Sequence, residues 1–176
     1  MKYLITTTHS PSQRTRTFVK DLASVLPNSE KVSRGKLSLD LLGAIAADMG
    51  ADKVLIVGER YGNPSFIEVY DVENAELVKR GTIRLKGVSL SSETKRRVYN
   101  VKSLCLEKEV LDEKAQEVLQ RLSEILSIPF CEGESDLKAS LERGERGFEL
   151  VFRAPGSKAI VGPVIRIREI DIEGEG

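Results

Sequence analysis

Residues 6–18 read Thr-Thr-Thr-His-Ser-Pro-Ser-Gln-Arg-Thr-Arg-Thr-Phe, and they mark the point where a predicted strand passes into a predicted helix. The strand is expected over residues 2–7, because aromatic and β-branched side chains favour extended backbone. Ser10 is a candidate N-cap for the helix, Pro11 suits the first helical position, and Gln13 can bond back to the cap. This capping box predicts a strand–turn–helix unit at the start of the chain.

The helix expected from Pro11 to about Leu26 carries one apolar face and one basic face. Its apolar residues recur at helical spacing, namely Phe18, Val19, Leu22, Val25 and Leu26. Arg16 and Lys20 lie one turn apart outside that face, and Arg14 lies at its margin. Because a helix N-terminus presents free N–H groups and a positive dipole end, this helix start is expected to attract anions. The simpler interpretation of the stretch alone is a well-capped helix with a solvated basic face.

Length and composition favour one domain with a real core, since the chain has 176 residues of which 40% are apolar. No apolar run is long enough to span a membrane, and the N-terminus lacks a signal-peptide pattern, so a cytoplasmic location is expected. Charged residues make up 31% of the chain, against three Gln and four Asn, a bias that fits adaptation to heat.

The two cysteines and the single histidine bear on metal and redox chemistry. Cys105 and Cys131 lie in apolar contexts, so buried free thiols in a reducing compartment are expected rather than a disulfide. The cysteines form no metal-binding pattern, and one histidine, His9, excludes a multi-histidine metal site. The sequence therefore predicts neither a metal nor a cofactor.

Basic and acidic residues alternate in blocks along a chain whose net charge is zero. Residues 1–36 have a net charge of +5 and residues 79–102 a net charge of +7. Residues 37–78 and 103–149 each have a net charge of −6. A surface field depends on the arrangement of charges rather than on their sum. Folding is therefore expected to be able to gather the two basic blocks on one face.

Further elements follow from periodicity and turn signals. A second helix is expected between the cap Ser38 and the stop Gly50, with Leu39, Leu42, Ile45, Ala46 and Met49 inward. Val54–Val57 is apolar without alternation, which is typical of a strand buried on both faces, and a hairpin with residues 66–70 is expected. The remaining expectations are a strand at 77–85, a polar loop at 87–95, a strand at 98–106, a helix at 112–126, an extended piece at 128–131, a weaker helix at 135–143, strands at 147–152 and 160–172, and a disordered tail at 173–176.

The order of these elements repeats once along the chain, with halves at about 1–94 and 95–172 of one domain covering residues 1–172. Leu26 corresponds to Leu126, and Val54–Val57 corresponds to Phe148–Val151, although the sequences of the halves are hardly alike. The pattern predicts an α/β fold of two structurally similar halves, each a mixed sheet with helices.

No catalytic set emerges from the sequence. Ser10 or Ser12 beside His9 would need a third orienting group, and none is identifiable. Glycine-rich nucleotide-binding loops are absent from the sequence. The protein is therefore not expected to be an enzyme.

The basic residues are the informative candidates, because a phosphate backbone uses such groups as charge partners. The candidates for RNA binding are Arg14, Arg16, Lys20, Arg34, Lys36, Arg84, Lys86, Lys95, Arg96 and Arg97. Aromatic residues make up only 5% of the chain, so contact with the backbone of structured RNA is expected rather than base stacking.

Residues 6–29, followed by Val32-Ser33-Arg34-Gly35-Lys36, resemble the opening of a Brix domain. Residues 54–59 and Gly62-Asn63-Pro64 are similar to its continuation. The whole chain resembles the single-domain archaeal form related to the Imp-type small-subunit processing factors. His9 departs from the pattern, since many relatives carry a basic residue at that position.

The resemblance implies a fold of two α/β halves similar to the anticodon-binding domains of class II aminoacyl-tRNA synthetases. It implies a non-enzymatic ribosome biogenesis factor that binds precursor ribosomal RNA or a small guide RNA. Separately from the resemblance, a monomer is expected. Its role would lie in pre-rRNA processing and small-subunit assembly, with other assembly proteins as further partners. The matching positions are Arg14, Arg16, Lys20, Arg34 and Lys36, whereas the candidates at 84–97 rest on charge. The alternative is a protein-interaction scaffold recruited to pre-ribosomal particles without direct RNA recognition.

Overall fold

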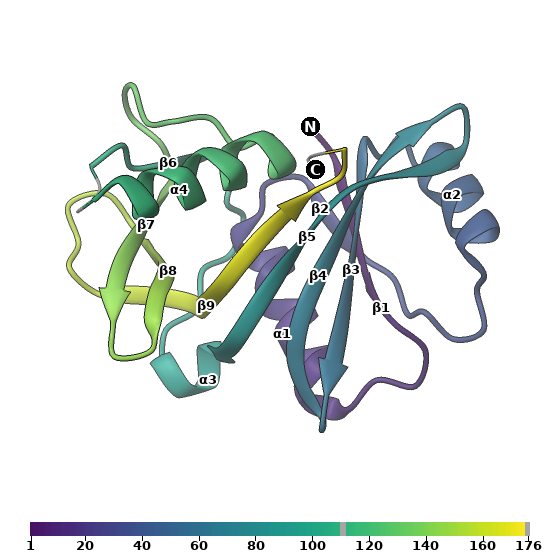
Figure 1. Cartoon of the computed structure of the whole chain (residues 1–176), viewed down its shortest axis with the longest axis horizontal. Coiled ribbons are helices and arrows are strands. Elements are labelled where there is room, and N and C mark those ends of the chain that lie inside the picture. Colours follow the sequence, from purple (N-terminus) through teal and green to yellow (C-terminus); the bar gives the residue numbers. More distant parts are fainter. Residues whose placement is uncertain (110–111, 175–176) are drawn as a thin grey trace.

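One mixed sheet organises the fold in the computed structural model, which describes residues 1–109 and 112–174 (Figure 1). Its strands are β1 (Tyr3–Thr7), β2 (Ser29–Lys31), β3 (Lys53–Arg60), β4 (Asn63–Glu73), β5 (Glu76–Ser89), β6 (Leu104–Leu106), β7 (Leu137–Gly144), β8 (Gly147–Arg153) and β9 (Ile160–Ile172). The helices are α1 (Gln13–Val25), α2 (Leu39–Asp48), α3 (Ser91–Thr94) and α4 (Glu113–Leu126). The prediction of an α/β protein is confirmed at this level.

The strands follow the order β2-β1-β3-β4-β5-β9-β8-β7-β6. β1 is parallel to both β2 and β3, and β6 is parallel to β7, while the other neighbouring pairs are antiparallel. Parallel neighbours need long crossover connections, and these connections contain α1, α2 and α4. β5 and β9 join the first and last parts of the chain in the middle of the sheet.

Two cores lie on opposite faces of the sheet. Tyr3 and Ile5 of β1 point to the larger core under α1 and α4, whereas Leu4 points to a smaller core under α2. The same alternation occurs in β3, whose residues 54–57 are all buried. The strand expected there, buried on both faces, is confirmed, and so is its hairpin with β4.

The first helix begins two residues later than the capping box predicted. Ser10 has a left-handed φ of 55°, and Ser12 is the N-cap, whose Oγ accepts a hydrogen bond from the backbone N of Thr15. Gln13 is therefore the first helical residue rather than the third. The cap at Ser38 is confirmed, but the expected inward residue Leu39 is 45% exposed.

The second half of the chain holds the largest errors of the sequence analysis. Residues 135–143 were expected to form a helix, but residues 137–144 form β7, with Leu137, Ala139 and Leu141 buried at a period of two. The expected strand at 98–106 is only the three residues of β6. The expected loop at 87–95 contains the end of β5 and the short helix α3.

These errors also affect the proposed match between Val54–Val57 and Phe148–Val151. Val54–Val57 lies in β3, which is parallel to its neighbour β1. Phe148–Val151 lies in β8, whose neighbours β7 and β9 are both antiparallel to it. The two segments therefore occupy different positions in the sheet. The counterpart of β3 is β7, because each of these strands has one parallel neighbour and one antiparallel neighbour.

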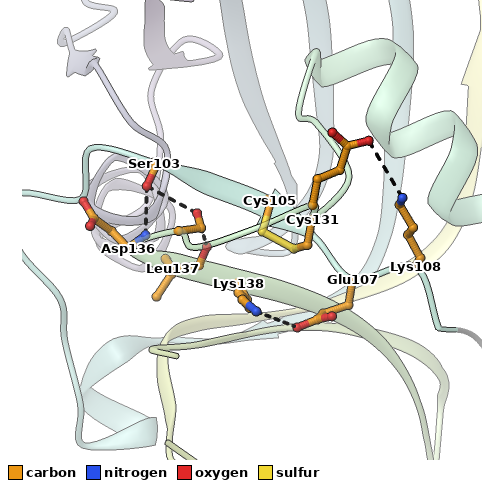
Figure 2. The surroundings of a disulfide bond; sticks show 10 residues. Ser103, Cys105, Glu107, Lys108, Cys131, Asp136, Leu137 and Lys138 are labelled. Atoms are coloured by element: carbon orange, nitrogen blue, oxygen red, sulfur yellow. Dashed lines mark hydrogen bonds and ion pairs between the residues drawn. A yellow bond between two sulfur atoms is a disulfide. The ribbon is translucent and has the colours of Figure 1, made fainter. Parts of the chain in front are cut away.

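The expectation of free thiols is wrong, because Cys105 and Cys131 form a disulfide (Figure 2). Cys105 lies in β6, and the segment containing Phe130 and Cys131 runs alongside this strand as a parallel bridge to Leu106. The backbone N of Cys131 donates to the carbonyl oxygen of Leu106 at 2.8 Å. Pairing between segments far apart in sequence places the two Cα atoms 4.9 Å apart, a separation suited to a disulfide.

The C-terminal segment was expected to be disordered from Glu173. The backbone N of Glu173 donates to the carbonyl oxygen of Arg80 at 2.8 Å, so this residue extends the pairing of β9 with β5. Residues 175–176 of the expected tail lie outside the described residues. No helix in the described part of the chain is long and apolar enough to cross a membrane.

Candidate nucleic-acid interface

The N-terminus of α1 already holds an anion, the carboxylate of Glu59 from the end of β3. Glu59 accepts hydrogen bonds from the backbone N of Ser12 at 3.0 Å, from its Oγ at 2.7 Å, and from the Thr15 hydroxyl. The Thr15 hydrogen bond is the main cause that lowers the pKa of Glu59, followed by the backbone bond from Ser12; Arg16 lowers it further. The expectation that this helix start attracts a foreign anion therefore does not hold.

The outer side of α1 is the first basic surface that stays open. Arg16 and Lys20 are exposed there, and neither has an acidic partner within ion-pair distance in the described part of the chain. Arg14 is held differently: its Nη2 donates to the carbonyl oxygen of Val88 at 2.9 Å and to Glu93 at 3.0 Å. Of the three predicted cations on this helix, two face solvent and one joins α1 to the end of β5.

A buried carboxylate brings the second basic block against α1. Asp21 has no exposed surface, and it accepts hydrogen bonds from the backbone N and the Oγ of Ser91 at 2.6 and 2.7 Å. Arg97 Nη2 lies 3.6 Å from Asp21 Oδ1. The backbone N of Gly162 donates to the carbonyl oxygen of Arg96 at 2.9 Å, which also fixes this segment to β9. Lys95 and Arg96 remain exposed beside these anchors.

A groove of about 470 Å³ lies where the two basic blocks meet. One wall comes from α1 and the segment leading into β2, and the other wall comes from residues 97–101. The lining residues are Lys20, Ala23, Ser24, Leu26, Asn28, Ser29, Lys31, Arg97, Val98, Tyr99, Asn100 and Val101. Among the described residues that line the groove none is acidic, so the cations of Lys20 and Lys31 are not neutralised at its surface.

Arg34 is a structural residue, because its guanidinium is buried. Its Nε donates to the carbonyl oxygen of Leu37 at 2.7 Å, and its Nη1 donates to that of Thr7 at 3.1 Å. These bonds hold the turn before α2 against the end of β1, and they leave Arg34 unavailable to phosphate. Lys36 is exposed on the same turn. His9 lies nearby, with Nε2 3.0 Å from the carbonyl oxygen of Leu37.

Arg84 and Lys86 lie away from the groove. The neighbours Ile83 and Leu85 point into the core under α1 and α4, so Arg84 points to the opposite face of the sheet. Arg84 is also paired, with Nε 2.7 Å from Asp171 Oδ2 and 3.7 Å from Glu169 Oε1. Lys86 is exposed. The structure thus gathers the basic block of the first residues with residues 95–97 but not with residues 84–86.

Sequence reasoning missed Lys31 and Tyr99 as parts of this surface. Lys31 follows the Pro27-Asn28 turn as an apparently isolated lysine, and only the parallel pairing of β2 with β1 places it at the groove. Tyr99 was overlooked because the low aromatic content argued against base stacking. Its position directly after the basic run Lys95-Arg96-Arg97 was the signal available in the sequence.

A mixed α/β sheet and a cationic groove beside α1 together define an α/β protein with a basic binding face. Comparison with known proteins then gives its family. No family model matches the sequence. A "Probable Brix domain-containing ribosomal biogenesis protein" of Sulfurisphaera tokodaii is 30% identical over 171 residues, covering 97% of this chain and 94% of that protein. A protein of the same name from Aeropyrum pernix is 44% identical over 90 residues, covering 51% of this chain and 50% of its own length.

Solved structures agree with this result. The crystal structure of a "probable ribosomal biogenesis protein from Aeropyrum pernix K1" superposes with a TM-score of 0.85 at 32% identity, over 96% of each chain. Mil, an archaeal Imp4-like protein, has the same fold, with a TM-score of 0.70 at 22% identity. The matched segment spans about half the length of several curated relatives, 50% in Aeropyrum pernix and 40% in Pyrococcus horikoshii. The chain belongs to the Brix domain-containing ribosomal biogenesis proteins.

Proposed function

We propose that this protein is a ribosome biogenesis factor that binds precursor ribosomal RNA or a small guide RNA through the α1 face and the adjoining groove. The names of its relatives support the biological process. The observation that carries the RNA assignment is the cationic groove, whose lysines have no ion-pair partner among the described residues, while other basic residues of the fold are paired. Such unpaired cations release counterions from a phosphate backbone, which is the main source of nucleic-acid affinity.

The proposed contacts are a subset of the basic residues considered from the sequence. Arg16, Lys20 and Lys31 supply charge along α1 and β2, and Lys95 and Arg96 extend the surface beyond the wall formed by residues 97–101. Arg97 lines the groove while its guanidinium is paired with Asp21, and Lys36, exposed on the turn before α2, is a further candidate contact. Lys86, exposed on β5 outside the groove, is a separate candidate contact. We assign Arg14, Arg34 and Arg84 to the fold, because their guanidinium groups are already bonded to protein oxygens.

The test compares two variants with the same change in net charge. Binding to a structured fragment of small-subunit ribosomal RNA is measured by fluorescence anisotropy over a range of salt concentrations. The triple variant Arg16→Gln, Lys20→Gln and Lys31→Gln is expected to reduce the slope of log K against log salt by about two to three. The control replaces three basic residues whose charges are balanced by carboxylates, Lys79, Arg80 and Arg84.

The control variant is expected to change the slope by less than about one, because its positive charges already have carboxylate partners. Equal effects of the two variants would show that net charge alone, and no particular surface, attracts the RNA. An affinity that does not depend on salt in the unmodified protein would refute the proposal.

Two further proposals concern the internal repeat of the chain and the stage of ribosome assembly at which the protein acts. We propose that the chain consists of two related halves, as in the anticodon-binding domains of class II aminoacyl-tRNA synthetases. The parallel pairs β1–β3 and β6–β7, each with a long helix packed on the same core, support this proposal. We place the action of the protein in pre-rRNA processing and small-subunit assembly, as a monomer without enzymatic activity.

The second candidate function is a protein-interaction scaffold, favoured by the acidic surface next to the disulfide. Glu132, Glu134 and Asp136 are exposed in this segment, and Asp136 lies beside Ser103 at the start of the short edge strand β6 (Figure 2). Affinity purification before and after nuclease treatment distinguishes the two functions. Partner proteins that remain bound after RNA has been removed would favour the scaffold, whereas their loss would favour direct RNA binding.

A further inference from the structure

The groove contains an aromatic ring that packing does not explain. Tyr99 is 74% exposed, although burial of an aromatic ring stabilises a fold. It lies in the groove wall formed by residues 97–101, whose Val98 and Val101 pack against the core. Val98 and Val101 therefore anchor the backbone on both sides of Tyr99, whose side chain remains in solvent.

The ring of Tyr99 also has a defined neighbour. The guanidinium carbon of Arg97 lies over the ring at 5.7 Å from its centroid. Arg97 is in turn held by the buried carboxylate of Asp21. A cation over one face of the ring restrains its orientation and leaves aromatic surface exposed for another flat group.

The groove offers complementary groups for each part of a nucleotide. Lys20 and Lys31 supply charge for phosphate, and the side-chain amides of Asn28 and Asn100 can donate and accept hydrogen bonds at a base edge. An exposed tyrosine beside such cations is the arrangement on which unpaired bases stack in proteins that bind single strands. A base inside a duplex is already stacked on its neighbours, so it cannot use this ring.

We infer that the groove binds an unpaired nucleotide of RNA, in a loop, bulge or single strand, with its base stacked on Tyr99 and its flanking phosphates near Lys20 and Lys31. The inference rests on the proposed RNA-binding function and makes it more specific. It differs from the expectation drawn from composition, which favoured backbone contact with paired RNA. A docked protein surface suits this groove less well, because charged residues are depleted at the centre of protein interfaces, whereas Lys20, Lys31 and Arg97 line this groove.

The test uses blunt-ended RNA duplexes of two strands that differ only by one bulged nucleotide, together with a single-stranded oligonucleotide. Affinities are measured by anisotropy at a fixed salt concentration. Tyr99→Leu is expected to weaken binding to the bulged duplex and the single strand by about 5- to 150-fold, the range of one lost base–aromatic stack. Its binding to the fully paired duplex is expected to stay within about twofold. Tyr99→Phe keeps the ring and is expected to retain the preference for unpaired RNA.

Tyr61 provides a matched control. It is 91% exposed and lies under a guanidinium, Arg60, at 5.5 Å, but it is outside the groove. Tyr61→Leu is expected to leave all three affinities unchanged. Photo-crosslinking of a bulged 4-thiouridine, followed by mass spectrometry, is expected to give an adduct on residues 97–101.

Three results would overturn the inference while leaving the proposed function intact. They are equal affinity for the paired and bulged duplexes, a uniform loss in Tyr99→Leu on all RNAs, and an equal loss in Tyr61→Leu. Displacement of the RNA by polyglutamate at the same charge concentration would show a general anion surface and would also overturn it. Absence of binding to every RNA would instead refute the proposed function itself.

Discussion

Asp21 and Ser91, seventy residues apart, form a closed pair in which one buried carboxylate accepts both the backbone N–H and the hydroxyl of one serine. The serine begins α3, and the carboxylate belongs to the middle of α1. Arg97 completes the cluster from the far side of α3. The second basic block therefore lies beside the first because of a buried acid, and the groove depends on that contact.

Replacing Asp21 with Asn tests this dependence. The amide can accept the N–H of Ser91, but it removes the negative charge beside Arg97 and leaves buried donors facing each other. We expect the free energy of unfolding in urea to fall by about 2 to 4 kcal/mol. Asp48→Asn at the exposed end of α2 is the control, and it is expected to change stability by less than about 0.5 kcal/mol. Equal effects of the two substitutions would contradict a structural role for Asp21.

Glu59 predicts a pH dependence of stability. Its pKa is lowered in the folded protein by hydrogen bonds from Thr15 and Ser12, so its contribution is fully present above the pKa of the unfolded chain. That contribution is lost as the pH falls through the lowered folded value. Glu59→Gln is expected to reduce stability at pH 7 by about 1 to 2 kcal/mol, and the difference from the unmodified protein should shrink below about pH 4.

The measurement is denaturant unfolding at several pH values between neutral and strongly acidic. Glu76→Gln serves as the control, since this carboxylate is exposed in the β4–β5 turn region. A difference between Glu59→Gln and the unmodified protein that stays constant across this range would show that the carboxylate charge does not stabilise the helix start.

The disulfide predicts a large effect of reducing agents on stability. Cys105 and Cys131 enclose a sequence separation of 26 residues that includes α4. In the loop-entropy model, a crosslink of this length stabilises a protein by about 3 to 4 kcal/mol. We expect reduction to lower the free energy of unfolding by that amount and to expose two titratable thiols. The double variant Cys105→Ala, Cys131→Ala is expected to be insensitive to reductant, and an equal response of both proteins would contradict the prediction.

Replacing Arg34 is expected to lower the stability of the protein without changing its RNA binding. Arg34→Gln loses hydrogen bonds to the carbonyl oxygens of Leu37 and Thr7, so we expect unfolding to become easier by about 1 to 3 kcal/mol. Because the guanidinium is buried, the salt dependence of RNA binding should stay unchanged in the folded variant. Lys36→Gln on the same turn is exposed and is expected to show the reverse. A reduced salt slope in Arg34→Gln would restore this residue to the RNA-binding surface.

The disulfide also shows where general rules about composition fail. Free thiols were expected because reducing compartments disfavour disulfides. Intracellular proteins of hyperthermophilic archaea are an exception to that rule, and a charge-rich composition poor in Gln and Asn points in the same direction. Neither observation identifies a pair of cysteines, because pairing depends on the approach of residues 128–131 to β6.

Local sequence determined those elements whose periodicity and boundaries agree. The amphipathic spacing in α1 and α4, the apolar run of β3 and the turn between β3 and β4 each have a single favourable interpretation. Residues 135–143 were misassigned because a short segment that mixes charged residues with leucine and alanine fits both the helical period of about 3.6 and the strand period of two. This segment forms a strand because it pairs with β6, which lies before α4 in the chain, and with β8, which follows it.

The binding surface likewise depends partly on local sequence and partly on tertiary structure. The sequence by itself determined which residues carry positive charge, and the helical spacing of Arg16 and Lys20 placed them together on one side of α1. Only the tertiary structure decided which charges remain free, because each ion pair depends on a distant carboxylate, as with Arg84 and Asp171. The helix start at residues 10–13, which sequence alone marked as an anion site, is occupied by Glu59 for this reason. Spacing along the chain defines the faces of single elements, whereas the groove exists only where packing brings separate elements together.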